Sequence, residues 1–287
     1  MRNKKWWLTL ICLSLLSGLA VADDTQQLLE SAQAAYNAGE YRHCAEQYAA
    51  VIKQGVESQS ILYNAACCWA LNGNKDDAFE YLFKAVELGY HKTTWLEQDS
   101  DLESLRDDPR WPDLISKSMA AEEIYLNSIN RELYEMYQVD QGDRLTDSLD
   151  WSVINQHDAH HRARAHQMLD SGLVVTADDY FHAAMIFQHG DDSTDYLLAR
   201  QLALKSVELD STKSIAKWLS AAAHDRYLWE VGKPQWYGTQ YHLIDNKWTI
   251  EPIDTTAVTD DDRLRCQVPP LAEARRKAEE MNRQNDN

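Results

Sequence analysis

A repeat near the start of the chain limits the fold more than any other feature of the sequence. Within residues 25–89, Gly39 and Gly73 lie 34 positions apart, and Cys44 has a counterpart in Ala78 at the same spacing. A fixed period of this size marks a repeat architecture, in which each unit buries its apolar face against the next. Glycine lets the backbone reverse at a turn, and small residues let helices cross closely. The repeat therefore predicts stacked helix pairs.

The local sequence points to one class of such repeats. Residues 34–41, Ala-Ala-Tyr-Asn-Ala-Gly-Glu-Tyr, resemble the first-helix end, the turn and the second-helix start of a tetratricopeptide repeat. Residues 23–118 are expected to form a short tetratricopeptide-like module, in which residues 95–115 supply a third, degenerate unit that closes one end. The inner helices should line a shallow groove that takes a peptide or protein partner. Repeat positions assign to this groove Leu29, Gln33, Tyr36, Tyr63 and Cys67.

The first 22 residues have the pattern of a cleaved secretory signal peptide. Three cations precede a hydrophobic run over residues 6–19, and Ala20-Val21-Ala22 offers the small residues of a cleavage site. The run is too short to cross a hydrocarbon core of about 30 Å. We expect a mature chain that begins at Asp23 and is periplasmic or secreted. An uncleaved anchor is the alternative.

The charge balance excludes several classes of partner. The full chain carries a net charge of −18, and removal of a signal peptide with three cations and no acid makes the remainder more negative still. Such a surface repels phosphate backbones and anionic lipid head groups. We expect no nucleic-acid partner, and no membrane partner after signal cleavage.

Four cysteines remain once the signal peptide is removed: Cys44, Cys67, Cys68 and Cys266. An oxidising compartment favours a disulfide, and no Cys-x-x-Cys or zinc-binding spacing is present. Adjacent residues on one helix point in different directions, so Cys67 and Cys68 should not pair with each other. The sequence leaves two alternatives, a bridge from Cys44 to one of them or free buried thiols.

The second part of the chain, residues 119–287, is expected to form an α-helical domain with a small β-hairpin. The sequence predicts a hinge at residues 118–123 and a helix from Met119 to about Val139. Capping and glycine signals then mark the later elements. They are a helix capped by Asp147 or Ser148 and ended at Gly172, a helix capped by Thr176 that runs through 188–189, and a helix over 193–209. A helix opened by Ser211-Thr212 that runs through Val231, a hairpin over 242–250 and a helix from 269 to about 282 follow.

Several of these helices carry polar residues within their apolar faces. His157 and His161 share a face with Ile154 and Met168, since residues three and four apart are neighbours on a helix. Buried polar groups are costly unless they are partnered, so these side chains should meet one another. The expected cluster, with the loop over residues 232–240 above it, contains Asp140, Gln141, Arg144, Arg164, Gln188, His189, Asp225, Arg226, Gln235, Tyr237, Thr239 and Gln240.

Two interpretations of this cluster are open. In the first it is a pocket whose arginines bind a polar or anionic group, with His189 and Asp225 as the candidate catalytic residues. In the second it is a hydrogen-bonded network that only fixes the register of the helices.

The order of the polar motifs resembles a family of bacterial helical domains of unknown function. The motifs are Asp-Gln-x-x-Arg at 140–144, Gln-His at 188–189, Asp-Arg at 225–226 and Gln-x-Tyr-Gly-Thr-Gln at 235–240, and Pro-Pro-Leu-Ala-Glu-Ala at 269–274 is also similar. The resemblance covers about residues 120–283. One difference is that His161 stands where the family has an asparagine after Asp158. The resemblance implies a domain and a set of site residues but no reaction.

Other chemistries have weaker support. His157, Asp158, His160 and His161 could offer metal ligands, but no His-Glu-x-x-His pattern is present. We predict no metal and no cofactor, because phosphate-loop, dinucleotide and nucleophile-elbow motifs are missing from the sequence. The sequence thus favours an exported protein whose helical domain binds or processes a small polar or peptide ligand, with the repeats as a docking surface. The alternative is a non-enzymatic periplasmic tetratricopeptide adaptor.

Overall fold

The computed structural model describes residues 24–145 and 150–285. The expected signal peptide lies outside these residues, as do Asp147 and Ser148. The expectation that one of these two caps the helix over 151–170 is wrong, because Asp150 caps it by accepting from the Ser152 amide at 3.0 Å. The described chain is mostly helical with one small antiparallel hairpin, which confirms the predicted fold class. Within the described ranges, no helix has both the length and the apolar character that a bilayer crossing requires.

The chain divides into two compact units between Leu126 and Asn127. The predicted hinge at residues 118–123 is wrong, because α6 (Trp111–Ser128) runs through it without a break. The segment is rich in good helix formers, and the buried Ser118 shares a hydrogen bond of 3.0 Å with Thr93. The helix ends instead just before Asn130, whose side chain caps the next one by accepting from the Leu133 amide at 3.1 Å.

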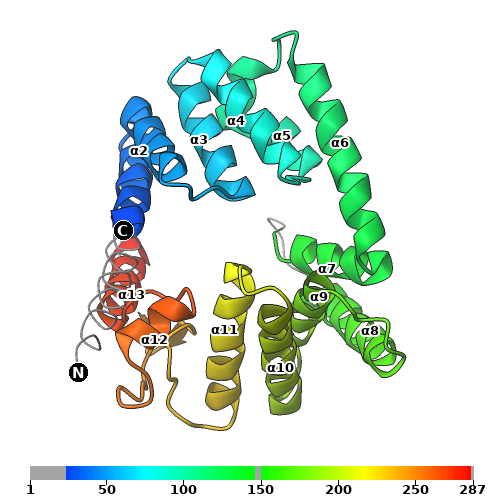
Figure 1. Ribbon diagram of the computed structural model, residues 1–287. Helices are drawn as coiled ribbons and strands as arrows, with labels where there is room; N and C mark the ends of the chain where they lie inside the picture. The colour runs from blue at the N-terminus through cyan, green and yellow to red at the C-terminus, as the bar shows by residue number, and fades with distance from the viewer. Residues whose placement is uncertain (1–23, 146–149, 286–287) are drawn as a thin grey trace, which may run out of the picture. The chain divides into compact units, whose positions relative to one another are not determined.

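Two helix pairs form the first part of the N-terminal unit (Figure 1). One pair is the helix over residues 24–37 with α2 (Tyr41–Lys53), and the other is α3 (Gln59–Leu71) with α4 (Lys75–Glu87). The turns within the pairs contain Gly39 and Gly73 at φ 75° and 81°, the left-handed region that favours glycine. Stacked helix pairs with a 34-residue spacing are what the repeat predicts; their tetratricopeptide class stays a prediction.

The third, irregular segment covers one side of the second helix pair. It consists of α5 (Thr93–Gln98), the 3-10 helix η1 (Ser100–Leu105) and α6. Its fully buried Leu96, Leu102 and Leu114 belong to the same apolar core as Phe79 and Leu82 of α4. This segment therefore closes the core that two repeats alone leave open.

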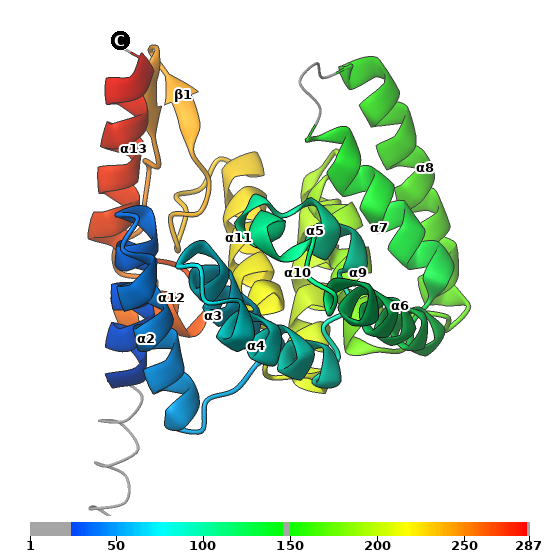
Figure 2. The same ribbon diagram turned by 90° about the horizontal axis from the view of Figure 1, so that it is seen from above.

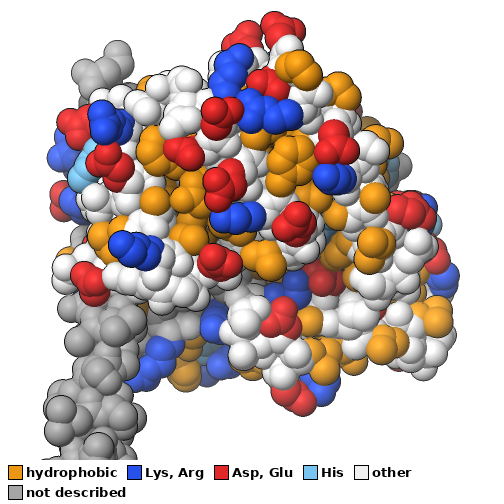
Figure 3. Space-filling view, turned by 45° about the horizontal axis from the view of Figure 1, so that its top comes forward, with side chains coloured by type: hydrophobic (Ala, Val, Ile, Leu, Met, Phe, Trp, Pro, Cys, Tyr) orange, Lys and Arg blue, Asp and Glu red, His pale blue; other side chains and the backbone are white. Residues whose placement is uncertain are grey.

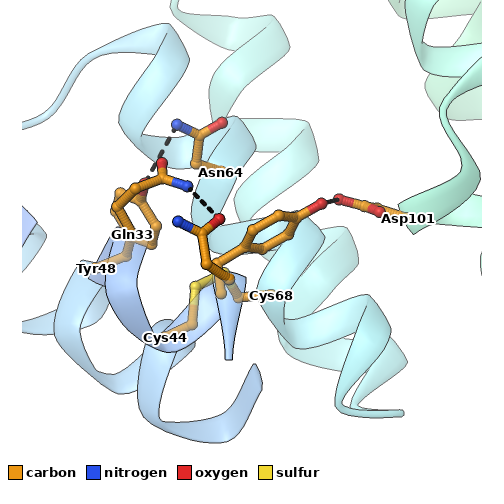
Figure 4. Close-up of a disulfide and its surroundings, with 8 residues drawn as sticks. Gln33, Cys44, Tyr48, Asn64, Cys68 and Asp101 are labelled. Carbon is orange, nitrogen blue, oxygen red and sulfur yellow. Dashed lines mark hydrogen bonds between the residues drawn. A yellow bond between two sulfur atoms is a disulfide. The ribbon is translucent and has the colours of Figure 1, made fainter. Parts of the chain in front are cut away.

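A disulfide joins the two helix pairs. It links Cys44 on α2 to Cys68 on α3, with the Cα atoms 5.9 Å apart, and Figure 4 shows it with Gln33, Tyr48 and Asn64 nearby. The structure thus selects one of the two alternatives that the sequence left open. Cys67 and Cys266 are free thiols.

The helices α7 (Arg131–Asp143), α8 (Trp151–Asp170), α9 (Ala177–Gln188), α10 (Ser193–Leu209) and α11 (Ser214–Glu230) build the C-terminal unit. α10 packs against both α9 and α11 (Figure 1). Two predicted start signals are confirmed, since Thr176 forms a capping box with Asp179 and Asp192 caps α10. The predicted start of the fifth helix at Ser211-Thr212 is wrong, because α11 follows Lys213 and the Thr212 hydroxyl instead donates to Asp210. The predicted helix over 119–139 is in fact two helices, α6 and α7.

The last elements are the predicted hairpin, β1 (His242–Ile244) and β2 (Lys247–Thr249), and the helices α12 (Asp260–Arg265) and α13 (Leu271–Asn285). The hairpin packs beside α13 (Figure 2). Asn282 of α13 fixes this contact, because its side chain accepts from the Trp248 amide at 2.7 Å and donates to the Trp248 carbonyl at 2.9 Å.

Candidate functional site

A groove of about 580 Å³ lies in the N-terminal unit. Four of the five predicted groove residues line it; the fifth, Leu29, packs instead against the core around the disulfide. Asparagine, glutamine and aromatic side chains alternate with carboxylates along its wall. The lining residues are Gln33, Tyr36, Tyr48, Tyr63, Asn64, Cys67, Cys68, Trp95, Gln98, Asp99, Ser100 and Asp101.

Two carboxylates at the start of η1 are the most polar part of this groove, and sequence reasoning missed both. The Tyr36 hydroxyl donates to Asp101 at 2.7 Å, and the Tyr63 hydroxyl donates to Asp99. In the part of the chain that the structure describes, neither carboxylate forms an ion pair. A usable signal was present in the sequence, since Asp99 is the cap of a short helix in the degenerate third unit.

The neighbouring tyrosines and thiol are held in their protonated forms. The hydrogen bond to Asp101, followed by burial, raises the pKa of Tyr36 above its usual range. Burial, followed by the nearby Cys67, does the same to the pKa of Tyr63. Burial and then Asp99 raise the pKa of Cys67. These hydroxyls therefore stay hydrogen-bond donors to the two carboxylates. The nearby Arg106 donates to the backbone carbonyl of Asp99 at 2.8 Å.

The same three side chains have ligand types that metals use. The sulfur of Cys67 and carboxylate oxygens of Asp99 and Asp101 all lie within 4.8 Å of one another. A metal binds the thiolate, however, and the raised pKa of Cys67 opposes thiolate formation, while both carboxylates already accept tyrosine hydroxyls. The arrangement suits an organic cation better than a metal ion.

In the C-terminal unit, the predicted polar cluster divides into two parts, and Asp225 organises the first. This fully buried carboxylate accepts from the amides of Trp236, Tyr237 and Thr239 at 2.8, 3.0 and 2.9 Å, and from the Thr239 hydroxyl at 2.9 Å. Arg144 and Arg226, which were expected in the same cluster, bind Asp140, Asp158 and the Gln188 carbonyl instead of Asp225. All the hydrogen bonds that Asp225 makes hold the loop over residues 232–240.

The glutamines of this loop are also engaged within the protein. The buried Gln235 side chain donates to the carbonyls of Gln240 and Ile250 at 2.9 and 2.8 Å, and that of Gln240 donates to the Ala222 carbonyl at 3.2 Å. Arg263, which sequence reasoning missed, donates to the carbonyls of Trp236 and Tyr237 at 2.7 and 3.1 Å. Gln235, Thr239, Gln240 and the Tyr237 backbone therefore build the loop, and Gly232 ends α11 at φ 69° as predicted.

The second part surrounds the buried Asp140, and we call it the Asp140 centre. Its carboxylate accepts from Arg144 at 3.1 Å and from Gln141 at 2.7 Å, and Nδ1 of His189 lies 2.9 Å from both oxygens. Arg144 also donates to Asp158 at 2.6 Å. The centre comprises Asp140, Gln141, Arg144, Asp158, His161, Gln188 and His189.

Arg162 of α8, which sequence reasoning missed, takes the buried position that was expected for Arg164. Arg164 lies outside the cluster, where it pairs with Glu132 at 2.6 and 2.8 Å near the surface. Arg162 is buried instead and donates to the His189 carbonyl at 3.0 Å. Arg226 donates to the Gln188 carbonyl at 2.7 Å. Arg162 and Arg164 both lie on α8, which has polar residues around its whole circumference. The sequence pattern therefore could not show which of the two arginines is buried.

Three buried atoms around the Asp140 centre have no hydrogen-bond partner: Oδ1 of Asp158, Nδ1 of His161 and Oε1 of Gln188. Burial lowers the pKa of His161, so its ring is neutral. Two of the four α8 residues that were considered as metal ligands have other partners, since Nδ1 of His157 lies 2.7 Å from Asp143 and Asp158 binds Arg144. Unpaired polar atoms in a protein interior are rare and call for a water or a ligand.

Comparison with known proteins agrees with the resemblance noted above. Residues 158–283 match the model of a family of unknown function, DUF6624. The match includes the Gln-His, Asp-Arg and Gln-x-Tyr-Gly-Thr-Gln motifs, whereas Asp140, Gln141 and Arg144 precede it. No curated protein and no solved structure matches the chain.

Proposed function

We propose that the protein is exported and that the groove of its N-terminal unit binds an extended segment of a partner protein through a lysine or arginine side chain. The observation that carries this proposal is the pair of carboxylates, Asp99 and Asp101, which line an open groove and form no ion pair within the described residues. Arg106 donates to the backbone carbonyl of Asp99 and leaves the carboxylate available. A cation from a partner would supply the missing charge.

The rest of the groove suits a peptide backbone and a basic side chain. The amides of Gln33, Asn64 and Gln98 can donate to and accept from main-chain groups. Trp95, whose surface is 57% exposed, offers an aromatic face on which a guanidinium can stack. On the face in Figure 3, acidic and basic side chains are interspersed with hydrophobic ones.

Two features support export. The residues before Asp23 have the composition of a signal peptide, and a disulfide such as Cys44–Cys68 persists in oxidising compartments. A secreted or periplasmic adaptor is the simplest function that combines these features with the groove.

A second function, binding or processing of a small polar ligand, rests on the Asp140 centre. The observation that favours it is the set of unpaired buried atoms on Asp158, His161 and Gln188. The loop over residues 232–240 is connected to this centre through α11. Asp225 holds the loop, and the next residue, Arg226, donates to the Gln188 carbonyl of the centre. We therefore assign this function to the C-terminal unit and adaptor binding to the N-terminal one.

A peptide array tests the adaptor function with the full mature chain. Peptides of equal length that carry lysine or arginine should bind, and those that carry glutamate or only neutral residues should not. Asp99→Asn/Asp101→Asn keeps the cap of η1 and should lower affinity at least about tenfold, which corresponds to about 1.4 kcal/mol. Glu57→Gln/Glu87→Gln removes the same charge from exposed positions of the same unit and should bind like wild type. Equal binding of acidic and basic peptides contradicts the proposal.

A further inference from the structure

The imidazole of His189 is oriented by a buried carboxylate. Arg144 and Gln141 both donate to Asp140, so this carboxylate acts as an acceptor, and Nδ1 of His189 at 2.9 Å must be the atom that donates. In the neutral ring, the other nitrogen, Nε2, carries the lone pair. The His189 side chain is 17% exposed, whereas Asp140 is 1% exposed. Asp140 therefore presents an acceptor nitrogen at the edge of a buried polar centre.

The unpaired atoms nearby are mainly acceptors as well. Oδ1 of Asp158 and Oε1 of Gln188 have no donor, and both residues are more than nine-tenths buried. Asp158 shares Arg144 with Asp140, and Gln188 precedes His189, which lies 2.9 Å from Asp140. Buried acceptors without donors are costly, and a group that brings N–H bonds would satisfy them.

The arginines of this region do not complement an anion. The two terminal nitrogens of Arg144 bind Asp140 and Asp158. Arg162 binds the His189 carbonyl and Asp195. Arg226 binds the Gln188 carbonyl. Within the centre, the two carboxylates of Asp140 and Asp158 share the single guanidinium group of Arg144. The sequence suggested an anionic ligand, but the contacts favour a cation.

We propose that the Asp140 centre binds a small organic cation, an alkylammonium or alkylguanidinium. Its N–H groups donate to Oδ1 of Asp158, Oε1 of Gln188 and Nε2 of His189. Asp140 is a positioning residue that sets the tautomer of His189, and Arg144 holds the two carboxylates in place. This site deepens the second function proposed above and is independent of the groove in the N-terminal unit.

Four probes of similar length test the charge preference on the full mature chain: putrescine, agmatine, 1,4-butanediol and succinate. Putrescine or agmatine should raise the melting temperature and shift the imidazole resonances of His189, and the comparison of these two separates ammonium from guanidinium. Butanediol and succinate should change neither. A response to succinate, or none to both amines, overturns the proposal.

Three substitutions test the residues. Asp158→Asn removes the charge but keeps an acceptor for Arg144, and Gln188→Met replaces the unpaired acceptor by an apolar group of similar size. Each should weaken binding of the responsive amine at least tenfold. If Asp158→Asn folds poorly, Gln188→Met still tests the proposal, because the Gln188 side-chain oxygen accepts no hydrogen bond that the substitution could break. Arg164→Gln, which alters an exposed pair on the same helix, should bind like wild type. Unchanged affinity in both Asp158→Asn and Gln188→Met overturns the proposal.

Discussion

The buried carboxylates of the C-terminal unit and the groove carboxylates of the N-terminal unit have opposite environments. In the N-terminal unit, Asp99 and Asp101 line an open groove, and their side chains accept hydrogen bonds mainly from tyrosine hydroxyls. In the C-terminal unit, Asp140 and Asp225 are almost completely buried and are surrounded by several donors each. A carboxylate whose acceptor positions are filled builds structure, whereas one that remains partly open is available to a partner. The same residue type thus has different consequences in the two units.

The units also differ in what joins their helices. A covalent bridge, Cys44–Cys68, connects α2 to α3 in the first unit. In the second, side chains such as Arg162, Gln235 and Arg263 connect distant segments through backbone carbonyls. Stability should therefore respond to reduction in one unit and to loss of buried polar groups in the other.

The largest expected effect is on the C-terminal unit. Asp225→Ala should lower its free energy of unfolding by about 3–5 kcal/mol, because the change leaves several buried N–H donors of the loop without an acceptor. Asp101→Ala, which removes one tyrosine contact in the groove, should cost less than about 1 kcal/mol. Urea unfolding followed by hydrogen exchange of each unit measures both. Similar losses for the two variants contradict the distinction between the units.

A somewhat smaller effect is expected from the disulfide. Cys44→Ser/Cys68→Ser should destabilise the N-terminal unit by about 3 kcal/mol, because the bridge closes a loop between residues 24 positions apart. Hydrogen exchange in α2 and α3 should rise, and that in the C-terminal unit should not. Cys266→Ser, which removes a free thiol, is the control. A loss of protection in α9 to α11 is the result that speaks against separate stabilisation.

Acid should weaken the C-terminal unit through His224. Burial, followed by Arg200, lowers the pKa of this histidine from 6.5 to about 4. As the pH falls, the unfolded chain takes up the proton first, so the stability is complete above pH 6.5 and is lost towards pH 4. We expect a loss of about 2 kcal/mol over this interval.

The control for this pH effect is His224→Gln, in which the stability curves at pH 7 and pH 4.5 should lie closer together than in wild type. The raised pKa values of Tyr36, Tyr63 and Cys67 keep those groups protonated over the whole interval. An unchanged pH dependence in His224→Gln rejects this histidine as the source.

The smallest effect is expected for Arg164→Gln. Its pair with Glu132 is largely in solvent, where ion pairs contribute little. The melting temperature should not change measurably. A clear loss places Arg164 in the buried network, where the sequence first suggested it.

Local signals in the sequence were sufficient for much of the fold. Thr176, Asp192 and Gly232 mark helix ends by side-chain and backbone chemistry that depends on a few neighbouring residues. The prediction of a hinge at residues 118–123 was wrong because these residues contain no local signal that ends a helix. They include neither glycine nor proline, and α6 continues through them. Helix ends could be predicted because they are local.

Partners within the site could not be predicted in the same way. The sequence correctly grouped Asp140 with Arg144 and His189, because short steps and motif order carry that information. Whether Arg162 or Arg164 turns inward depends on where α8 packs, and this is a property of the assembled unit. The carboxylates of the groove were missed because their segment, η1, has no repeat pattern.

The peptide group between Trp236 and Tyr237 explains how a charge at Asp225 can exist without a direct ion pair. Its N–H donates to Asp225 at 3.0 Å, and its carbonyl accepts from Arg263 at 2.7 Å. The amide dipole is thus aligned between an anion and a cation, and it transmits their attraction across the backbone. α11 and α12 are linked electrostatically through a main-chain bond that no substitution of a side chain can remove. Loss of either charge alone leaves the amide polarised from one side, so the two residues should behave as a coupled pair although they never touch.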